Sequence, residues 1–323
     1  MIALGIESSN SRGMGHLFRS LLYVEYFKSH NIDFVYLIND DNKSIMVLKQ
    51  KNIQYEIVNY SDESSCWERT IIEKYNVNIW LNDKFETSKN FAKHIKDSGI
   101  FLALIDDIGE GEVYADIHFA GLISFSKKNF KSLNTISGME YVILNDEIEK
   151  YKRVRECVNS IIVSFGGSDP YSNTLAVVKE LMRYDYKFDV TIGPNSTCQF
   201  ELEKMNDGRF RILKNVPSLI ELFSHYDFAI TGGGVTCCES NAAGIPCIII
   251  ANAAHEINTG ICMQSFGGCV YAGDYLEWDK DIIKSISDMD IKEMSRKGMS
   301  VFKTDAIDKI FSLIFEKYEK MKG

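Results

Sequence analysis

The clearest signal of the fold in this chain is the stretch Ala229-Ile230-Thr231-Gly232-Gly233-Gly234-Val235-Thr236-Cys237-Cys238-Glu239-Ser240. The apolar residues before the three glycines are typical of a buried parallel strand, and residues 235–243 have the spacing of a helix. Gly244-Ile245-Pro246 and a second apolar run, residues 247–251, come next. A strand, a glycine turn, a helix and a further strand predict half of a nucleotide-binding fold.

The glycine turn has two interpretations. Glycines let the backbone turn sharply and approach a ligand closely, and the start of the following helix presents free N–H groups to a phosphate. In that case Thr236 adds a hydroxyl to the phosphate site, and Glu239, one helical turn later, accepts hydrogen bonds from ribose hydroxyls. The other interpretation is a tight strand-to-helix turn without a ligand.

The rest of the chain repeats this alternation of strands and helices. Strands are expected at 2–6, 33–38, 53–58, 79–81, 100–105, 115–123, 160–165, 188–192, 210–213, 228–231, 247–251 and 268–271, and helices at 15–30, 42–50, 67–75, 87–97 and in the tail 279–322. Such alternation predicts the α/β class, with parallel sheets covered on both faces. The polar segment 124–159 interrupts it. We therefore expect two doubly wound Rossmann-like domains facing across a cleft: 1–150, and 151–323, which carries the glycine turn and a helical tail.

Length and composition narrow the class of protein further. The chain has 323 residues, 45% of them hydrophobic, which is enough for two packed cores. Its net charge of −9 argues against nucleic acid or an anionic membrane as partner. It begins with a strand-like run instead of a basic leader, and no apolar stretch is long enough to span a bilayer. We expect a soluble, cytoplasmic protein.

The eight cysteines stand at 66, 157, 198, 237, 238, 247, 262 and 269, without a Cys-x-x-Cys pair or a regular spacing. This pattern indicates neither a zinc site nor a disulfide framework. We expect small buried apolar residues in a reducing compartment.

The loop after the first strand carries the first catalytic candidate. It contains Gly13-Met14-Gly15-His16-Leu17-Phe18-Arg19, which places His16 and Arg19 on one face of a helix start. A neutral imidazole there could take a proton from water, because the helix dipole favours the uncharged form. The alternative is a purely structural histidine. The loop lacks a Walker sequence and the full dinucleotide-binding spacing.

Other loops also follow predicted strands and are expected to line the cleft. They are Ser164-Phe165-Gly166-Gly167-Ser168-Asp169-Pro170, Leu104-Ile105-Asp106-Asp107-Ile108-Gly109, the position of Asp83, and Asn252-Ala253-Ala254-His255-Glu256-Ile257-Asn258. Neighbouring acids point to opposite sides, so Asp106 and Asp107 do not form a carboxylate pair. Capping or turn formation is the alternative role for both acids.

Taken together, these loops resemble a known family. Gly13-Met14-Gly15-His16-Leu17-Phe18-Arg19, Ile105-Asp106-Asp107, Ala115-Asp116-Ile117, Phe165 to Pro170, and Gly232 to Glu239 fall in the order of motifs in the UDP-sugar hydrolases of pseudaminic acid biosynthesis, also known as spore-coat polysaccharide proteins. That family shares the GT-B fold of the glycosyltransferase that makes lipid II. The resemblance runs from Met1 to about Tyr271.

The resemblance implies a specific reaction. The family cleaves UDP-2,4-diacetamido-2,4,6-trideoxy-β-L-altrose to UDP and the free sugar, by attack of water at the anomeric carbon, without a metal or other cofactor. His16 matches the residue that orients and deprotonates the water. We expect the protein to be a monomer whose partner is its UDP-sugar substrate. The implied UDP-binding residues are Gly233, Gly234, Val235, Thr236 and Glu239, and the candidate substrate-binding residues are Gly13, Gly15, Arg19, Asp83, Asp106, Gly167, Ser168, Asp169, His255 and Asn258.

Three departures from the family pattern concern the sugar side. Ile6-Glu7-Ser8 stands where the family has Arg-x-Asp, and Asp83-Lys84-Phe85 stands where it often has Asp-x-Tyr. The family's Asn-Gln is only loosely matched within 254–258. The nucleotide is therefore better supported than the sugar. The alternative functions are a glycosyltransferase with a UDP-sugar donor and a nucleotide-sugar binding module without chemistry.

Overall fold

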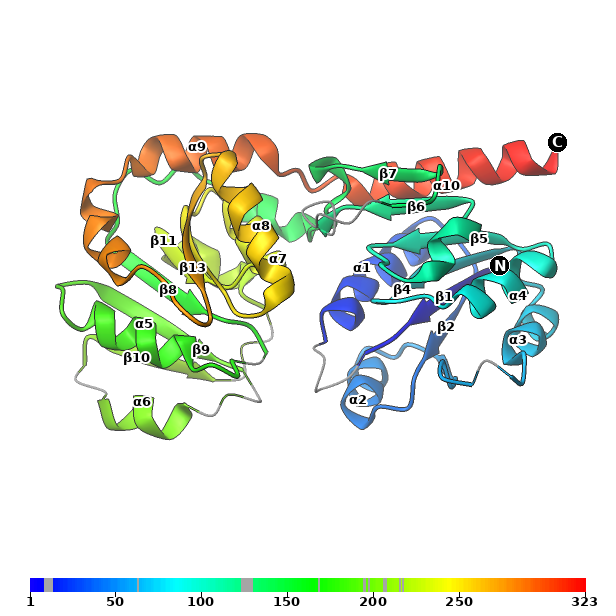
Figure 1. Ribbon diagram of the computed structural model, residues 1–323, viewed down its shortest axis with the longest axis horizontal. Coiled ribbons are helices and arrows are strands. Elements are labelled where there is room, and N and C mark those ends of the chain that lie inside the picture. Colours follow the sequence, from blue (N-terminus) through cyan, green and yellow to red (C-terminus); the bar gives the residue numbers. More distant parts are fainter. Residues whose placement is uncertain are drawn as a thin grey trace. The chain divides into compact units, whose positions relative to one another are not determined.

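The computed structural model describes residues 1–8, 14–62, 64–122, 130–167, 169–193, 196, 198–205, 208–214, 216 and 218–323. The described chain forms two compact units, Met1–Ile143 with Asp305–Gly323, and Leu144–Thr304. Each unit contains one parallel sheet with helices packed against it (Figure 1).

The first unit contains a seven-stranded sheet in the order β3-β2-β1-β4-β5-β6-β7. Every pairing in it is parallel. The elements are β1 (Ile2–Ile6), α1 (Gly15–Ser29), β2 (Phe34–Ile38), α2 (Asn42–Gln50), β3 (Tyr55–Ile57), α3 (Trp67–Tyr75), β4 (Ile79–Asp83), α4 (Lys89–Asp97), β5 (Phe101–Ile105), η1 (Glu110–Tyr114), β6 (Ile117–Ala120), β7 (Thr135–Ser137), η3 (Met139–Tyr141) and α10 (Ala306–Lys322).

Successive residues of β1 supply the two faces of this sheet. Ile2, Leu4 and Ile6 pack into a core that includes α1 and α10, whereas Ala3 packs into a second core with residues of α3 and α4. Because side chains alternate between the faces of a strand, both faces of β1 are apolar and both are covered. The sheet is thereby fixed as the middle of three layers.

The second unit contains a six-stranded sheet in the order β10-β9-β8-β11-β12-β13, and its pairings are also parallel. Its elements are η4 (Asp146–Lys150), β8 (Ser160–Ser164), α5 (Asn173–Leu181), β9 (Lys187–Ile192), α6 (Gln199–Met205), β10 (Phe210–Lys214), η5 (Ile220–His225), β11 (Phe228–Thr231), α7 (Val235–Ala242), β12 (Cys247–Ala251), α8 (Ala254–Ser265), β13 (Cys269–Asp274), η6 (Lys280–Asp288) and α9 (Ile291–Val301).

The division of the chain differs from the sequence prediction in two respects. The first unit ends at Ile143 instead of residue 150, and the end of the tail belongs to the first unit, not to the second. The reason is the apolar face of α10, from which Phe311 packs on Tyr23 and Phe27 of α1 with ring centroids 5.9 and 4.9 Å apart. The strand β7 also lies in the segment expected to interrupt the fold.

The buried Arg155 provides a stability prediction for the second unit. Its guanidinium is fully buried and donates to the carbonyl oxygens of Phe223 (2.7 Å), Arg153 (2.8 Å) and Ala243. Burial and the nearby Arg153 lower the pKa of Arg155 to about 10. We expect Arg155→Met to reduce the free energy of unfolding by about 3 kcal/mol, because buried carbonyls lose their donors.

Urea denaturation of the whole chain measures this effect. Arg183→Met is the matched control, since Arg183 is exposed and pairs only with Glu180 in the described structure. The control is expected to stay within about 0.5 kcal/mol of the wild type. Equal losses in the two variants would contradict the prediction.

Candidate functional site

Two acids lie at neighbouring strand ends in the first unit. Asp83 is the last residue of β4, and Asp106 directly follows β5. The strands β4 and β5 pair with Asp83 opposite Ile105, and Ile6, the last residue of β1, also pairs with Asp83. Since parallel strands end at one edge of the sheet, this register brings both carboxylates next to the helix that follows β1.

His16 and Arg19 of α1 converge on these acids. His16 Nδ1 lies 2.6 Å from Asp83 Oδ1. Arg19 donates from Nε to Asp83 Oδ2 (2.7 Å), from Nη2 to Asp83 Oδ1 (2.5 Å) and from Nη1 to Asp106 Oδ2 (2.5 Å). Tyr23, a turn after Arg19, donates its hydroxyl to Asp83 Oδ2 at 2.6 Å. These contacts gather His16, Arg19, Asp83 and Asp106 into one network.

The network determines which ring nitrogen of His16 can act as a base. Asp83 is fully buried, and although burial opposes ionisation, the charge of Arg19 and the hydrogen bonds from His16 and Arg19 hold its pKa well below the usual range. An ionised carboxylate only accepts hydrogen bonds, so Nδ1 of His16 carries the proton. The lone pair of the neutral ring is then on Nε2, where it can accept a proton, as in other histidine–carboxylate pairs.

Arg19 and Tyr23 stay in their ordinary protonation states within this network. Burial lowers the pKa of Arg19, but Asp83, Tyr23 and Asp106 together outweigh burial and raise it well above the ordinary value. Burial and Asp83 also raise the pKa of Tyr23 well above 10. The two side chains therefore serve as fixed donors that orient Asp83.

Asp107 has a different role from Asp106, as the opposite directions of neighbouring side chains predict. Asp107 Oδ1 accepts from the backbone N–H of Thr87 (2.9 Å) and of Gly109 (2.7 Å), and Oδ2 accepts from the Thr87 hydroxyl. Burial raises its pKa to about 6, although these hydrogen bonds oppose the shift. Asp107 thus holds two loops together, while Asp106 faces Arg19.

The three glycines of the second unit lie between β11 and α7, and their close neighbour is α8. Gly233 donates its N–H to Glu256 Oε2 at 2.9 Å, and Asn252 donates to the same oxygen at 2.7 Å. A Cβ on Gly233 would lie 2.7 Å from the Glu256 carbonyl oxygen. The packing of α8 against the turn therefore requires glycine at this position, in addition to any requirement set by a ligand.

The start of α7 still offers donors and a carboxylate. The first-turn N–H groups of a helix, here from Val235 and Thr236 onward, have no acceptor within the helix. Glu239 is partly buried in the next turn, and burial raises its pKa to about 7. No hydrogen bond to the Glu239 carboxylate is found among the described residues.

The remaining predicted residues have varied surroundings. Gly15 begins α1 with open space where a Cβ would be, and Gly167 is equally unconfined. Both oxygens of Asp169 accept from the start of α5, at 2.9 Å from Asn173 N and 2.8 Å from Thr174 N, so this carboxylate caps a helix. His255 and Asn258 lie in the first turns of α8. Gly13 and Ser168 lie outside the described residues.

Two residues of these sites escaped the sequence analysis. Tyr23 follows His16 by seven residues and so shares its helix face, a spacing that could have revealed it. Glu256 stands beside the predicted His255, but only the tertiary approach of α8 to the glycine turn gives it a role.

Comparison with known proteins gives distant relatives. No protein-family model matches the chain. It is 24% identical over 269 residues to an uncharacterized protein of Methanocaldococcus jannaschii, covering 77% of this chain but only 55% of that protein, so it spans about half the length of that relative. It is 20% identical over 294 residues to the spore coat polysaccharide biosynthesis protein SpsG of Bacillus subtilis, covering 84% of this chain and 83% of SpsG.

Solved structures establish the fold. Acinetobacter baumannii MurG matches with a TM-score of 0.71 at 12% identity, over 98% of this chain and 99% of MurG. The UDP-GlcNAc 2-epimerase of Neisseria meningitidis, solved with UDP-GlcNAc bound, matches with a TM-score of 0.67 at 10% identity, over 98% and 100%. The chain has the GT-B fold. None of the helices described in it is long and apolar enough to cross a membrane.

Proposed function

We propose that this chain hydrolyses a UDP-linked 2,4-diacetamido-trideoxy sugar to UDP and the free sugar, in the biosynthesis of a pseudaminic-type acid. The observation that carries the proposal is the contact between His16 Nδ1 and the buried Asp83, which directs the lone pair of the ring to Nε2. The sugar class rests on the ordered motifs of the sequence. The similarity to SpsG, named for spore coat polysaccharide biosynthesis, supports a role in sugar metabolism.

In the proposed reaction, His16 Nε2 takes a proton from a water molecule as that water attacks the anomeric carbon. The bond between this carbon and the diphosphate oxygen breaks, and UDP leaves with the electron pair. Asp83 stabilises the imidazolium that forms, and Arg19 keeps Asp83 ionised. No cofactor enters the proposal.

We assign UDP to the turn between β11 and α7. The first-turn N–H groups of α7 are suited to the diphosphate, which carries negative charge as it leaves. Gly233 allows the close packing of the turn but offers no free donor, because Glu256 already accepts a hydrogen bond from its N–H. Glu239 is the acceptor proposed for the ribose hydroxyls.

Glycosyl transfer is the alternative, since the same lone pair could deprotonate an acceptor hydroxyl. Incubation with altro-configured and related UDP-diacetamido sugars in acceptor-free buffer separates the two reactions. Hydrolysis predicts stoichiometric UDP and free sugar. UDP release that requires an added sugar or lipid acceptor would refute hydrolysis and support transfer, and UDP binding without turnover would support a binding module.

The raised pKa of Glu239 predicts pH-dependent UDP binding. Ribose hydroxyls donate to the ionised carboxylate, so below the pKa of about 7 the free protein must lose a proton to bind. We expect the Kd for UDP to rise by up to about tenfold per pH unit below 7 and to level off above it. Isothermal titration calorimetry measures the Kd for UDP from about pH 5.5 to about pH 8.5. This range extends about one to two pH units on either side of the Glu239 pKa.

Glu239→Gln is the matched control because it keeps the shape but does not titrate. Any titration of UDP itself affects both proteins alike, so the difference between the two profiles reports on Glu239. The variant is expected to bind UDP about tenfold or more weakly at the highest pH, having lost hydrogen bonds to a charged group. Identical profiles would exclude Glu239 as the ribose acceptor.

A further inference from the structure

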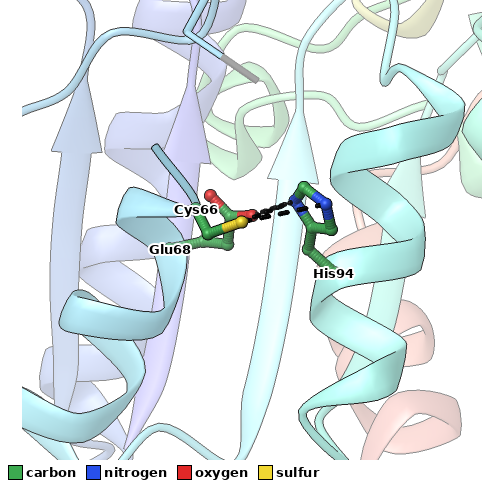
Figure 2. Close-up of side chains that lie close together, drawn as sticks. All are labelled: Cys66, Glu68 and His94. Carbon is green, nitrogen blue, oxygen red and sulfur yellow. Dashed lines mark hydrogen bonds and ion pairs between the residues drawn. The ribbon is translucent and has the colours of Figure 1, made fainter. Parts of the chain in front are cut away.

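Three side chains of the first unit that the proposed reaction does not use lie close together. Cys66 directly precedes α3, Glu68 lies in its first turn, and His94 lies on α4 (Figure 2). Cys66 Sγ is 3.8 Å from Nδ1 and 3.9 Å from Nε2 of His94, whose Nδ1 is 2.5 Å from Glu68 Oε1. One ligand atom from each residue lies within 4.8 Å of the others.

Aromatic packing holds the elements that carry this cluster. Trp67, between Cys66 and Glu68, packs on Phe91 of α4 and Trp80 of β4, with ring centroids 5.8 and 5.9 Å apart. Glu68 itself is buried, with 2% exposure. The start of α3 and the middle of α4 are thus fixed against each other, so the three side chains meet without reorganisation of the backbone.

The backbone of Cys66 supports a function for the cluster. Cys66 has φ 49° and ψ 40°, the left-handed region that a non-glycine residue seldom adopts, and its side chain makes no capping hydrogen bond to the helix. This conformation directs Sγ toward His94, as Figure 2 shows. Unusual backbone conformations of this kind concentrate at sites that bind or react.

We propose that Cys66, Glu68 and His94 bind one divalent cation of the zinc type. A thiolate, an imidazole and a carboxylate are the donors that zinc takes in proteins, whereas magnesium and calcium take oxygen ligands. Three protein ligands leave one of the four positions of a tetrahedral ion for water, which the partly exposed Cys66 and His94 admit.

Binding of the cation releases one proton to solvent. The Cys66 thiol loses its proton to solvent, and the proton between His94 Nδ1 and Glu68 moves to Nε2, so that Sγ, Nδ1 and Oε1 face the cation. The thiolate and the carboxylate then neutralise its two charges. The cation ties the start of α3 to α4, independently of the network around His16.

Cobalt(II) is the probe for this site, because a bound thiolate gives a charge-transfer absorption band. The full chain is treated with a chelator, dialysed and titrated with cobalt(II), and zinc(II) is then added to displace it. We expect one equivalent to bind with the thiolate band, and zinc to remove the band. Cys66→Ser should abolish the band, and His94→Gln should weaken binding at least about tenfold.

Cys262→Ser is the matched control, since Cys262 is another partly buried, free cysteine but lies in the second unit. It should retain the band at full intensity. Absence of stoichiometric binding by the wild type, an unchanged band in Cys66→Ser, or equal loss in Cys262→Ser would each overturn the proposal. Cys66→Ser changes one atom of a partly exposed side chain, and circular dichroism verifies its fold.

Discussion

His16→Asn is expected to lower kcat for UDP-sugar hydrolysis by about 10²- to 10⁴-fold, the usual contribution of a positioned general base. The amide of asparagine can still donate to Asp83 in place of Nδ1 but offers no basic nitrogen where Nε2 lies. The Kd for UDP should be unchanged, because we assign UDP to the turn before α7. Steady-state UDP release and calorimetric UDP binding, measured on the same preparation, test both statements.

The control for this variant is His225→Asn. His225 is an exposed histidine of η5 in the second unit and takes no part in the proposed site. Its substitution should leave kcat at the wild-type value. Full activity in His16→Asn would remove His16 from the mechanism, whatever its effect on binding.

Asp83→Asn is the second change with a large expected effect. Asparagine cannot hold the His16 proton on Nδ1 as an ionised acceptor does, so the lone pair no longer stays on Nε2. The equivalent change in a serine protease costs about 10⁴-fold in kcat, and we expect a loss of about 10³- to 10⁴-fold. Arg19 also loses a fully buried partner, so the free energy of unfolding should fall by about 3–5 kcal/mol.

The pH dependence of stability provides a separate readout for Asp83. Its depressed pKa means that its contacts stabilise the fold fully above the unfolded pKa of about 4, and that this stabilisation is lost as pH falls toward the folded pKa. Urea denaturation of Asp83→Asn should therefore show a weaker dependence on pH below about 4. Asp97→Asn, at an exposed ion pair with Lys93, should match the wild type in activity and in acid sensitivity.

Much of the fold could be predicted from the sequence because most of the strands are short apolar runs followed by a glycine or polar turn. The helices 42–50 and 67–75 begin and end where expected. The three residues of β7 were missed because they lie in a polar segment, where strand patterning is absent. The partner of α10 could not be predicted, since an amphipathic face does not specify which core will bury it.

The candidate site could be predicted only where local rules apply. Helical spacing aligned His16 with Arg19, and the common edge of parallel strands brought Asp83 to Asp106. Glu256, by contrast, reaches Gly233 through the packing of α8 on a loop 23 residues earlier. His94 likewise meets Glu68 across 26 residues. Such contacts depend on tertiary packing, and no spacing rule in the sequence indicates them.

The central claim is that His16 activates water for attack at the anomeric carbon. Its most direct test is a single turnover of a UDP-2,4-diacetamido-trideoxy sugar in water enriched in heavy oxygen, without an acceptor, followed by mass spectrometry of both products. The account predicts that the wild type releases UDP that carries no heavy oxygen, and that His16→Asn releases almost no UDP. Heavy oxygen in the phosphate of UDP, or release of UDP only after an acceptor is added, would contradict it.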